Sequence, residues 1–283
     1  MKFAFSTVSC PKWDFETILA RAKEYGYDGV EIRGFLNEAI LTASNVFLTD
    51  PAKIRDQFAS AGIEIACLAS SIVYSGKKKI DEQLAKDLKA YIDTAAAIGT
   101  PLVKVFDTQV KAGQTRDSAG VAMGNWLVPM ADYAADRDIT IVIENALSFR
   151  QSKEMWSILD RLQHPSIACC WDVFNAALTG ESPLISVPTL NSKIAYCQIK
   201  DAKFGPLGAS YTKLGQGDVK GPQFITRLRG IGYEGYVTVE WEKAWLPGLA
   251  EPEEVLPDAV KTLKEWMKLG VELEEEPVAA GKH

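Results

Sequence analysis

Four short apolar segments of the chain carry, at or near their ends, a side chain that could bind a cation or move a proton. These side chains are Glu144, Asp172, Gln198 and Glu240. Three of them are carboxylates, which act as general acids and bases in enzymes and repel one another at close range. A divalent metal ion is the simplest way to keep three neighbouring carboxylates ionised. The pattern therefore predicts a metal centre with acid–base chemistry, provided that the fold brings the four side chains together.

A carboxylate at the end of a strand has a second interpretation, because Asp and Glu also cap the helix that follows. Helix capping does not explain why a buried apolar strand should direct a glutamine or a glutamate inward. The four side chains together therefore favour a site. Asn145, the residue after Glu144, is expected to face outward and to cap the next helix.

Short apolar segments alternate with longer amphipathic ones along the whole chain, which is typical of parallel strands joined by crossover helices. We expect eight strands, at Phe3–Val8, Gly29–Arg33, Ile63–Ser70, Leu102–Phe106, Thr140–Glu144, Ile167–Asp172, Ile194–Lys200 and Tyr236–Glu240. The clearest helices are expected at Phe15–Tyr25, Glu82–Ile98, Ala119–Asp138, Lys153–Leu162, Gln223–Ile231 and Pro252–Leu269. Because side chains alternate along a strand, the four candidate residues can share one inward face, which Lys200 and Glu242 continue.

Eight strand–helix units within residues 1–270, with no linker rich in Pro, Gly or Ser, predict an α/β protein with a single (β/α)8 TIM barrel. The acidic residues 271–283 are expected to form a flexible tail. A dinucleotide-binding sheet is disfavoured, because Val8–Trp13 lacks the glycine-rich turn that should follow the first strand. In a TIM barrel the active site lies at the carboxyl ends of the strands, where the four candidate side chains fall.

The chain of 283 residues has a formal net charge of −6, which disfavours non-specific nucleic-acid binding. We expect its basic run, Lys77–Lys79, to lie in a solvated loop. The five cysteines show no CxxC spacing, which favours a reducing compartment, and we expect a cytoplasmic protein. No apolar run is long enough to span a membrane.

The sequence resembles the sugar phosphate isomerase/epimerase family, which has the xylose isomerase-like TIM barrel. The nearest branches are the hydroxypyruvate isomerases, the keto-sugar epimerases and the inosose dehydratases. The resemblance covers about residues 2–267. The motifs that carry it are, in chain order, Gly26–Glu31, Glu144–Asn145, Trp171–Asn175, Gln198–Asp201, Leu214–Val219 and Gly232–Glu240.

The resemblance implies one divalent metal ion bound by Glu144, Asp172, Gln198 and Glu240, with the two glutamates also acting as acid and base. Most members have histidine where this chain has Gln198, and the hydroxypyruvate isomerase branch is similar to this chain in having glutamine. An all-oxygen ligand set favours Mn²⁺ or Mg²⁺, with Co²⁺ and Zn²⁺ as alternatives. The DNA-repair branch of the family needs a histidine-rich zinc cluster, and this chain has two histidines, so we expect no nucleic-acid partner.

The resemblance implies a metal-dependent isomerase or epimerase that acts on a small sugar, sugar phosphate or hydroxy-carbonyl compound through an enediolate. An inosose-type dehydratase on the same metal site stays open, as does a non-catalytic barrel that binds a polyol. The sequence does not choose between isomerisation and epimerisation. It also leaves self-association into a homo-oligomer open.

Other polar residues near the strand ends are candidates for contacts with the substrate, against the alternative that they are surface charges or ion pairs. These candidates are Asn175, Arg150, Lys200, Lys203 and Glu242. Four aromatic residues near strand ends could wall a sugar pocket. They are Trp13, Phe35, Trp241 and Trp245.

Overall fold

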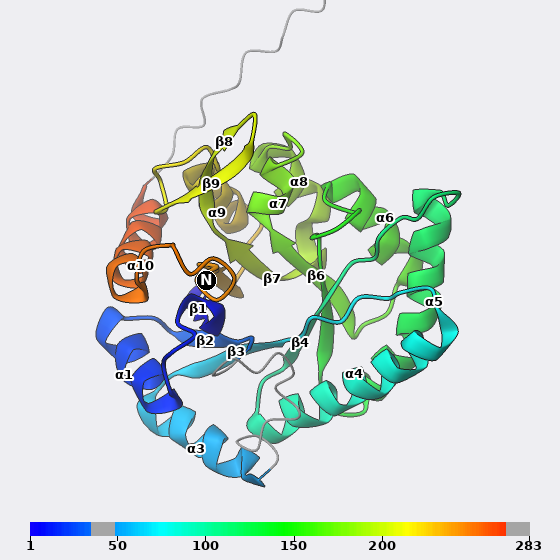
Figure 1. Cartoon of the computed structure of the whole chain (residues 1–283), viewed down its shortest axis with the longest axis horizontal. Coiled ribbons are helices and arrows are strands. Elements are labelled where there is room, and N and C mark those ends of the chain that lie inside the picture. The colour runs from blue at the N-terminus through cyan, green and yellow to red at the C-terminus, as the bar shows by residue number, and fades with distance from the viewer. Residues whose placement is uncertain (35–48, 270–283) are drawn as a thin grey trace, which may run out of the picture.

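The computed structural model describes residues 1–34 and 49–269, so the predictions for Phe35 and for the tail 271–283 lie outside the described residues. Eight parallel strands close into a barrel, in the order β1-β10-β7-β6-β5-β4-β3-β2 (Figure 1). They are β1 Lys2–Ser6, β2 Gly29–Ile32, β3 Glu64–Ala69, β4 Leu102–Phe106, β5 Thr140–Glu144, β6 Ile167–Asp172, β7 Ile194–Ile199 and β10 Tyr236–Val239. The prediction of a single (β/α)8 barrel is confirmed.

Helices surround the barrel and cover the outer faces of the strands (Figure 1). They are α1 Phe15–Tyr25, α3 Pro51–Ala61, α4 Lys78–Ile98, α5 Arg116–Ala135, α6 Ser152–Leu162, α7 Val173–Ala177, α8 Pro183–Leu190, α9 Gly221–Gly230 and α10 Pro252–Lys268. Two single 3-10 turns, Thr7–Ser9 and Asn191–Lys193, lie after β1 and before β7. No helix in the described part of the chain is long and apolar enough to cross a membrane.

Helix α1 shows how local sequence sets the strand–helix units. Its first turn is capped by Asp14, whose side chain accepts a hydrogen bond of 2.8 Å from the backbone N–H of Thr17. It ends at Gly26, which has a φ of 80° and donates its N–H to the carbonyls of Ala22 and Lys23. Because glycine adopts this left-handed conformation freely, the chain turns back at once and β2 begins three residues later.

The barrel has two apolar regions. The large one lies between the strands and the helices and includes Trp171, Phe5 and Phe224. The small one fills the inside of the barrel below the candidate site, and its buried members are Ala4, Ala66, Cys67, Val142, Cys170 and Tyr196. The hydroxyl of Thr238 donates to the Tyr196 hydroxyl oxygen at 2.6 Å, so the buried Tyr196 hydroxyl has a hydrogen-bond partner. It forms a packed floor and supports the polar side chains above it.

The structure corrects the predicted secondary structure at the lysine run and after β7. Lys77 is the residue before the first turn of α4, so Lys78 and Lys79 are helical and the expected loop is wrong there, although all three lysines are exposed to solvent as expected. The chain after β7 forms an unpredicted antiparallel hairpin, β8 Asp201–Gly205 and β9 Gly208–Thr212, at the upper edge of Figure 1. Its strands are short and lack a clear alternation of apolar and polar residues, which is why periodicity missed them.

A buried carboxylate ties this hairpin to the glycine-rich segment that follows it. Asp201 accepts hydrogen bonds of 2.9 Å from the backbone N–H groups of Gly215 and Gly217 and one of 3.1 Å from that of Val219. A Cβ atom on Gly217 would lie 2.2 Å from the Asp201 carboxylate and 2.5 Å from the carbonyl oxygen of Ala202. The glycines of Leu214–Val219 therefore permit the close approach of backbone to Asp201.

We expect Gly217→Ala to destabilise the protein by about 1–3 kcal/mol, because the added methyl group would force Asp201 and its bonded backbone apart. Urea unfolding followed by circular dichroism measures the change. Gly230→Ala is the matched control, since nothing lies within 4 Å of a Cβ atom there, and its stability should stay within about 1 kcal/mol of wild type. Equal stability of the two variants would contradict the proposed role of Gly217.

Candidate active site

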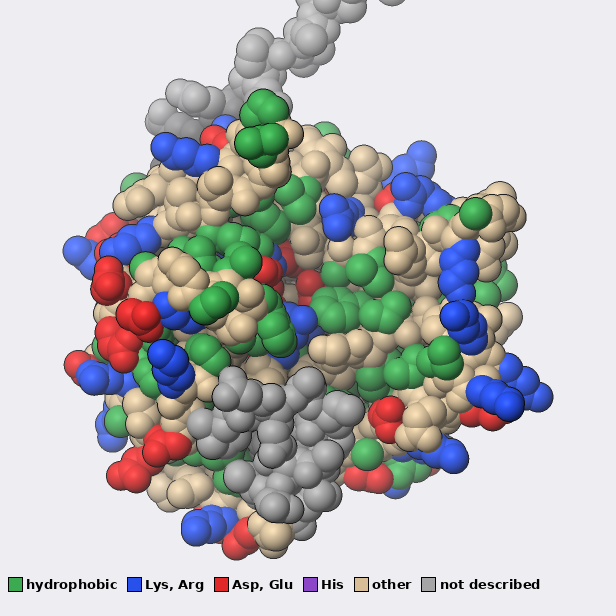
Figure 2. All heavy atoms as spheres, viewed as in Figure 1, with side chains coloured by type: hydrophobic (Ala, Val, Ile, Leu, Met, Phe, Trp, Pro, Cys, Tyr) green, Lys and Arg blue, Asp and Glu red, His purple; other side chains and the backbone are tan. Residues whose placement is uncertain are grey.

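The structure brings the four strand-end residues into one buried cluster at the carboxyl ends of β5, β6, β7 and β10. Asp172 pairs with Gln198 across β6 and β7, and Gln198 also pairs with Thr238, two residues before Glu240. Glu144, Asp172, Gln198 and Glu240 are each no more than 2% exposed. Figure 2 shows acidic and basic side chains within a hollow near the middle of this face, bordered by hydrophobic ones.

Asn175 joins two of the carboxylates from the short helix α7. Its amide nitrogen donates to Asp172 at 3.0 Å and to Glu144 at 3.3 Å. The other oxygen of Asp172 accepts a hydrogen bond of 2.8 Å from the backbone N–H of Phe174. Asp172 therefore caps α7 and also lies in the cluster, so capping and a place beside Glu144 do not exclude each other.

The ammonium group of Lys200 lies among three carboxylates. It is 2.8 Å from Asp172, 2.5 Å from Glu240 and 3.2 Å from Glu242. Only 4% of the Lys200 side chain is exposed, whereas Glu242 is partly open to solvent. A buried ammonium has three donors to satisfy, and here it donates to Asp172 and Glu240 and forms an ion pair with Glu242.

Two further cations, which were not among the candidates from the sequence, complete the cluster. Lys104 is fully buried and forms an ion pair with Glu144. The guanidinium of Arg33 is 2.5 Å from Glu240 and lies within 6 Å of the ring centroids of Phe106 and Trp245. Among the residues that the structure describes, the buried Nε atom of Arg33 has no hydrogen-bond partner.

A fourth buried carboxylate, Glu31 on β2, approaches from the other side of the barrel. Gln198 donates its amide N–H to Glu31 at 2.9 Å and to Glu240 at 3.5 Å. The amide oxygen of Gln198 accepts a contact of 3.5 Å from the thiol of Cys170. Gln198 therefore acts here as a hydrogen-bond donor to carboxylates.

The charges in the cluster shift one another's pKa. Burial alone would raise the pKa of Glu240, but the cations of Lys200 and Arg33 hold it well below its ordinary value. Burial raises the pKa of Asp172 to about 6, although Lys200 opposes the change. Burial would lower the pKa of Lys200, and Asp172 and Glu240 more than compensate, so the ammonium stays charged.

The loop after Glu144 is fixed by Asp107. This buried carboxylate accepts hydrogen bonds of 2.6 Å from the backbone N–H groups of Leu147 and Phe149 and one of 3.2 Å from that of Ala146. Burial raises the pKa of Asp107 to about 7, although these hydrogen bonds oppose the change. The residues after β5 are thus held in one conformation beside the cluster.

The donor set suits an oxygen-preferring divalent metal in chemical type, since it consists of carboxylates and an amide. Within residues 1–34 and 49–269, however, no three His, Cys, Asp or Glu side chains lie close enough together to hold a metal ion as they stand. Lys200 lies between Asp172 and Glu240, and the Gln198 amide presents its nitrogen to Glu240. A metal ion would therefore fit these residues only after it replaces the ammonium and the amide turns over.

The other residues singled out in the sequence divide into two groups. Asn175, Lys200 and Glu242 belong to the cluster. Arg150 donates its Nε to the carbonyl of Ala146 at 3.0 Å instead of to a carboxylate of the cluster, and Lys203 is exposed on the hairpin strand β8.

The expectation for Asn145 is wrong. Its side chain is buried, accepts a hydrogen bond of 2.7 Å from the backbone N–H of Asp172 and donates to the carbonyl of the same residue at 3.0 Å. Asn145 therefore ties the end of β5 to the end of β6 and places Asp172 beside Glu144.

The sequence carried a usable signal for the residues that were missed. Glu31 and Lys104 each interrupt an apolar strand, in Gly29–Ile32 and Leu102–Phe106. A charged residue inside a strand that is covered on both faces should have a charged partner. The sequence analysis looked for polar side chains only at the ends of β5, β6, β7 and β10. The same search in β2 and β4 would have identified Glu31 and Lys104 as candidates.

Three of the aromatic candidates lie in different surroundings. Trp241 contacts Tyr211 of β9 edge-on, and Tyr211 stacks on Phe174 of α7, so these rings line the side of the cluster next to the hairpin. Trp245 lies near Arg33. Trp13 is buried against Phe5 and donates its N–H to Glu253, so it is a packing residue.

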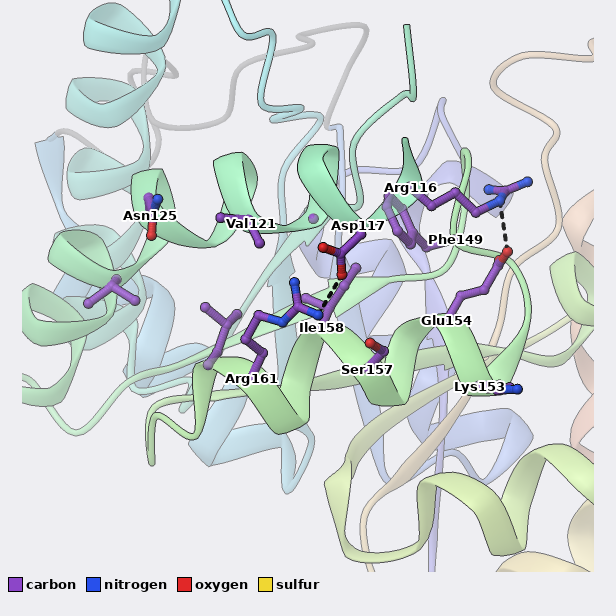
Figure 3. A pocket seen from close by; sticks show the side chains of 13 residues that line it. Arg116, Asp117, Val121, Asn125, Phe149, Lys153, Glu154, Ser157, Ile158 and Arg161 are labelled. Carbon is purple, nitrogen blue, oxygen red and sulfur yellow. Dashed lines mark hydrogen bonds and ion pairs between the residues drawn. The ribbon is translucent and has the colours of Figure 1, made fainter. Parts of the chain in front are cut away.

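A separate cavity of about 430 Å³ lies on the outer wall of the barrel, between α5 and α6 (Figure 3). Its rim carries two ion pairs, Arg161 with Asp117 and Arg116 with Glu154. None of the strand-end residues lines this cavity. It is therefore a groove between two helices, separate from the buried cluster.

Comparison with known proteins shows what the chain is similar to. A sequence model described as "Xylose isomerase-like TIM barrel" matches residues 19–266. No curated protein sequence matches the chain.

Several solved structures share the fold over almost the whole chain. The IolI protein with a bound zinc atom has a TM-score of 0.78 at 17% identity, covering 94% of this chain and 98% of that chain. The probable 3-DHS dehydratase AsbF from Bacillus anthracis has a TM-score of 0.78 at 17% identity, covering 93% and 99%. A D-psicose 3-epimerase with D-tagatose from Clostridium cellulolyticum H10 has a TM-score of 0.76 at 13% identity, covering 95% and 100%.

We expect Lys104→Met to lower the free energy of unfolding by about 3–5 kcal/mol, because it leaves the Glu144 carboxylate buried without its cation. The double variant Lys104→Met/Glu144→Gln should recover much of this loss. Chemical unfolding of the single and double variants measures both effects.

Lys2→Met is the control, because it breaks an exposed pair with Glu64 and should change stability by no more than about 1 kcal/mol. A double variant no more stable than Lys104→Met would show that the two side chains do not depend on each other.

Proposed function

Because the chain belongs to the xylose isomerase-like TIM barrel family, we propose that it is a divalent-metal-dependent isomerase or epimerase of a small sugar, sugar phosphate or hydroxy-carbonyl compound. The observation that carries the proposal is the placement of two buried glutamates, Glu144 and Glu240, with Asp172 and Gln198 between them. Two carboxylates facing one substrate carbon from different strands can remove a proton on one side and return it on the other.

The metal would be held by Glu144, Asp172, Gln198 and Glu240, and the oxygen ligands favour Mn²⁺ or Mg²⁺ over Zn²⁺. When bound, such an ion polarises a carbonyl group and makes the hydrogen on the adjacent carbon more acidic. The likeness to an IolI protein with a bound zinc atom supports the proposal that this chain also binds a metal ion.

The proton transfer falls to the two glutamates. In the barrel β6 and β7 lie between β5 and β10, so Glu144 and Glu240 approach the cluster from separate directions. Return of the proton to the same carbon on its opposite face gives an epimer, and return to the neighbouring carbon interconverts an aldose and a ketose.

The remaining residues of the cluster suit the binding of hydroxyl and carbonyl oxygens. Asn175 on α7 offers the N–H groups of its side-chain amide. The Arg33 guanidinium has a buried N–H without a partner among the described residues. The rings of Tyr211 and Trp241 supply an apolar wall beside these polar groups, which is the usual composition of a sugar site. The likeness to a D-psicose 3-epimerase bound to D-tagatose supports a sugar as the substrate.

The function is tested by incubating the protein with Mn²⁺ and a panel of keto-sugars, including D-tagatose and D-fructose, in deuterated water. Deuterium on a carbon adjacent to the carbonyl, detected by NMR, is the expected result. An ultraviolet-absorbing enone without retained deuterium would favour the dehydratase, for which the likeness to AsbF is the precedent. Binding of a sugar without exchange would favour the polyol-binding alternative.

We expect Glu144→Gln and Glu240→Gln each to slow deuterium incorporation by at least about 100-fold, because each removes one group that accepts or returns the proton. Circular dichroism checks that both variants remain folded. Glu64→Gln is the matched control, since Glu64 lies at the start of β3, at the opposite end of the barrel. Wild-type exchange in either site variant would exclude that glutamate from the reaction.

We expect Gln198→His to retain metal binding and to shift the preference towards Zn²⁺ or Co²⁺, because an imidazole nitrogen suits these ions better than an amide oxygen. Isothermal titration with Mg²⁺, Mn²⁺, Co²⁺ and Zn²⁺ gives the order of affinities. An unchanged order in the variant would mean that residue 198 does not contact the metal.

A further inference from the structure

The cavity of about 430 Å³ between α5 and α6 is a concave surface separate from the cluster at the strand ends. We propose that this α5–α6 cavity binds a small molecule with an apolar body and a carboxylate group, and that its occupant stabilises the loop that follows Glu144. The inference goes beyond the proposed function and does not depend on it.

The size and the lining of the α5–α6 cavity suit a small molecule. Such sites commonly enclose about 300–1,000 Å³ and combine apolar walls with a few polar groups. Figure 3 shows Val121 and Asn125 on α5 facing Ser157 and Ile158 on α6, and the ring of Phe149 also lines the cavity. The walls therefore offer an aromatic ring and branched aliphatic side chains, together with an amide and a hydroxyl group.

A glycine in the cavity lining keeps part of the space open. Gly120 lies inside α5, where glycine is less favourable than alanine. A Cβ atom there would lie 3.2 Å from the side chain of Ile158 and 3.8 Å from the ring of Phe149. A side chain at position 120 would therefore take up space beside two residues that line the cavity.

The charged side chains around the α5–α6 cavity favour an anionic ligand. Arg116 is 3.0 Å from Glu154, and Arg161 is 2.5 Å from Asp117 (Figure 3). Lys153 also lines the cavity, and no carboxylate of the described residues forms an ion pair with it, so the cations outnumber the acids. Both pairs are open to solvent and can rearrange, and a guanidinium can bind a carboxylate through two parallel hydrogen bonds.

The lining of the cavity is joined to the loop that follows Glu144. The Arg116 guanidinium donates a hydrogen bond to the carbonyl of Ser148. The backbone N–H of Phe149 donates to the buried carboxylate of Asp107 at 2.6 Å. A molecule that packs on the Phe149 ring and binds Arg116 would therefore contact the loop from outside, while Asp107 holds it from inside.

A second copy of the chain is the alternative occupant. A stable protein interface buries about 800 Å² on each partner, so apolar surface has to extend well beyond a cavity. Among the residues that line the α5–α6 cavity, Val121 is the one large hydrophobic side chain that is exposed, and the others are partly or fully buried. The apolar surface therefore lies inside the cavity, which favours a small molecule.

The test uses two probes with the same apolar body, 3-phenylpropanoate and 3-phenylpropan-1-ol. Each is titrated into the full-length protein by isothermal titration calorimetry. We expect saturable binding of one 3-phenylpropanoate per chain and at least about tenfold weaker binding of the alcohol, because only the carboxylate can pair with Arg116 or Lys153. The affinity for 3-phenylpropanoate should fall as the NaCl concentration rises.

Two variants with matched controls locate the binding site. Ser157→Trp places a large ring in the cavity from an exposed position of α6 and should abolish binding of 3-phenylpropanoate, whereas Gln83→Trp, at an exposed position of α4, should bind it normally. Lys153→Gln should weaken binding at least about threefold, because it removes a cation that has no acidic partner. Lys86→Gln, which removes an exposed lysine of α4, should leave the dissociation constant unchanged.

Hydrogen–deuterium exchange followed by NMR tests the connection to the loop. At a 3-phenylpropanoate concentration about ten times its dissociation constant, the amides of Leu147 and Phe149 should exchange up to about tenfold more slowly, because loop openings that empty the cavity become rarer. The amide of Gly215 donates to Asp201 beside the hairpin and should exchange at an unchanged rate.

Several results would overturn the inference. Absence of saturable 3-phenylpropanoate binding by wild type, or normal binding by folded Ser157→Trp, would overturn the site. If Ser157→Trp fails to fold, Val121→Trp, which fills the cavity from α5, decides the same question. Equal affinities for the two probes would overturn the carboxylate, and unchanged exchange of Leu147 and Phe149 would overturn the connection to the loop. A dimer that is lost in Ser157→Trp and competes with the probe would assign the cavity to a second copy and overturn the small-molecule site.

Discussion

The need to neutralise buried negative charge governs the end of this barrel where the strands finish. Glu31, Glu144, Asp172 and Glu240 are all buried at the strand ends. Carboxylates are costly to remove from water unless cations and hydrogen bonds compensate them. The positions of the nearby lysines, the arginine and the polar amides follow from this requirement.

Buried polar side chains also connect the cluster to the loops and strand ends around it. Asn145 holds the end of β6 beside the end of β5, and Asp107 fixes the loop that follows Glu144. On the other side, Asp201 binds the glycine-rich segment beneath the hairpin that carries Tyr211. Each of these buried side chains uses its hydrogen bonds on backbone groups, so the cluster depends on loops that have little freedom to shift.

Sequence reasoning succeeded where the relevant information is local. The eight strands show as short apolar runs, and alternation along each strand identifies Asp172 or Glu240 as an inward side chain. It failed where the partner lies far along the chain, as for Lys104 with Glu144 and Arg33 with Glu240. The alternation of residues along a strand indicates that a carboxylate is buried. Which lysine or arginine forms an ion pair with it depends on how the strands are arranged in the closed barrel.

The packed layer of Ala4, Val142, Tyr196 and their neighbours closes the interior of the barrel below the cluster. Anything that reaches the carboxylates has to arrive from the side of the strand ends, along the same route as anything that leaves. Under the proposed function, a metal ion and a sugar would therefore share one entrance, and whichever entered first would narrow the way for the other.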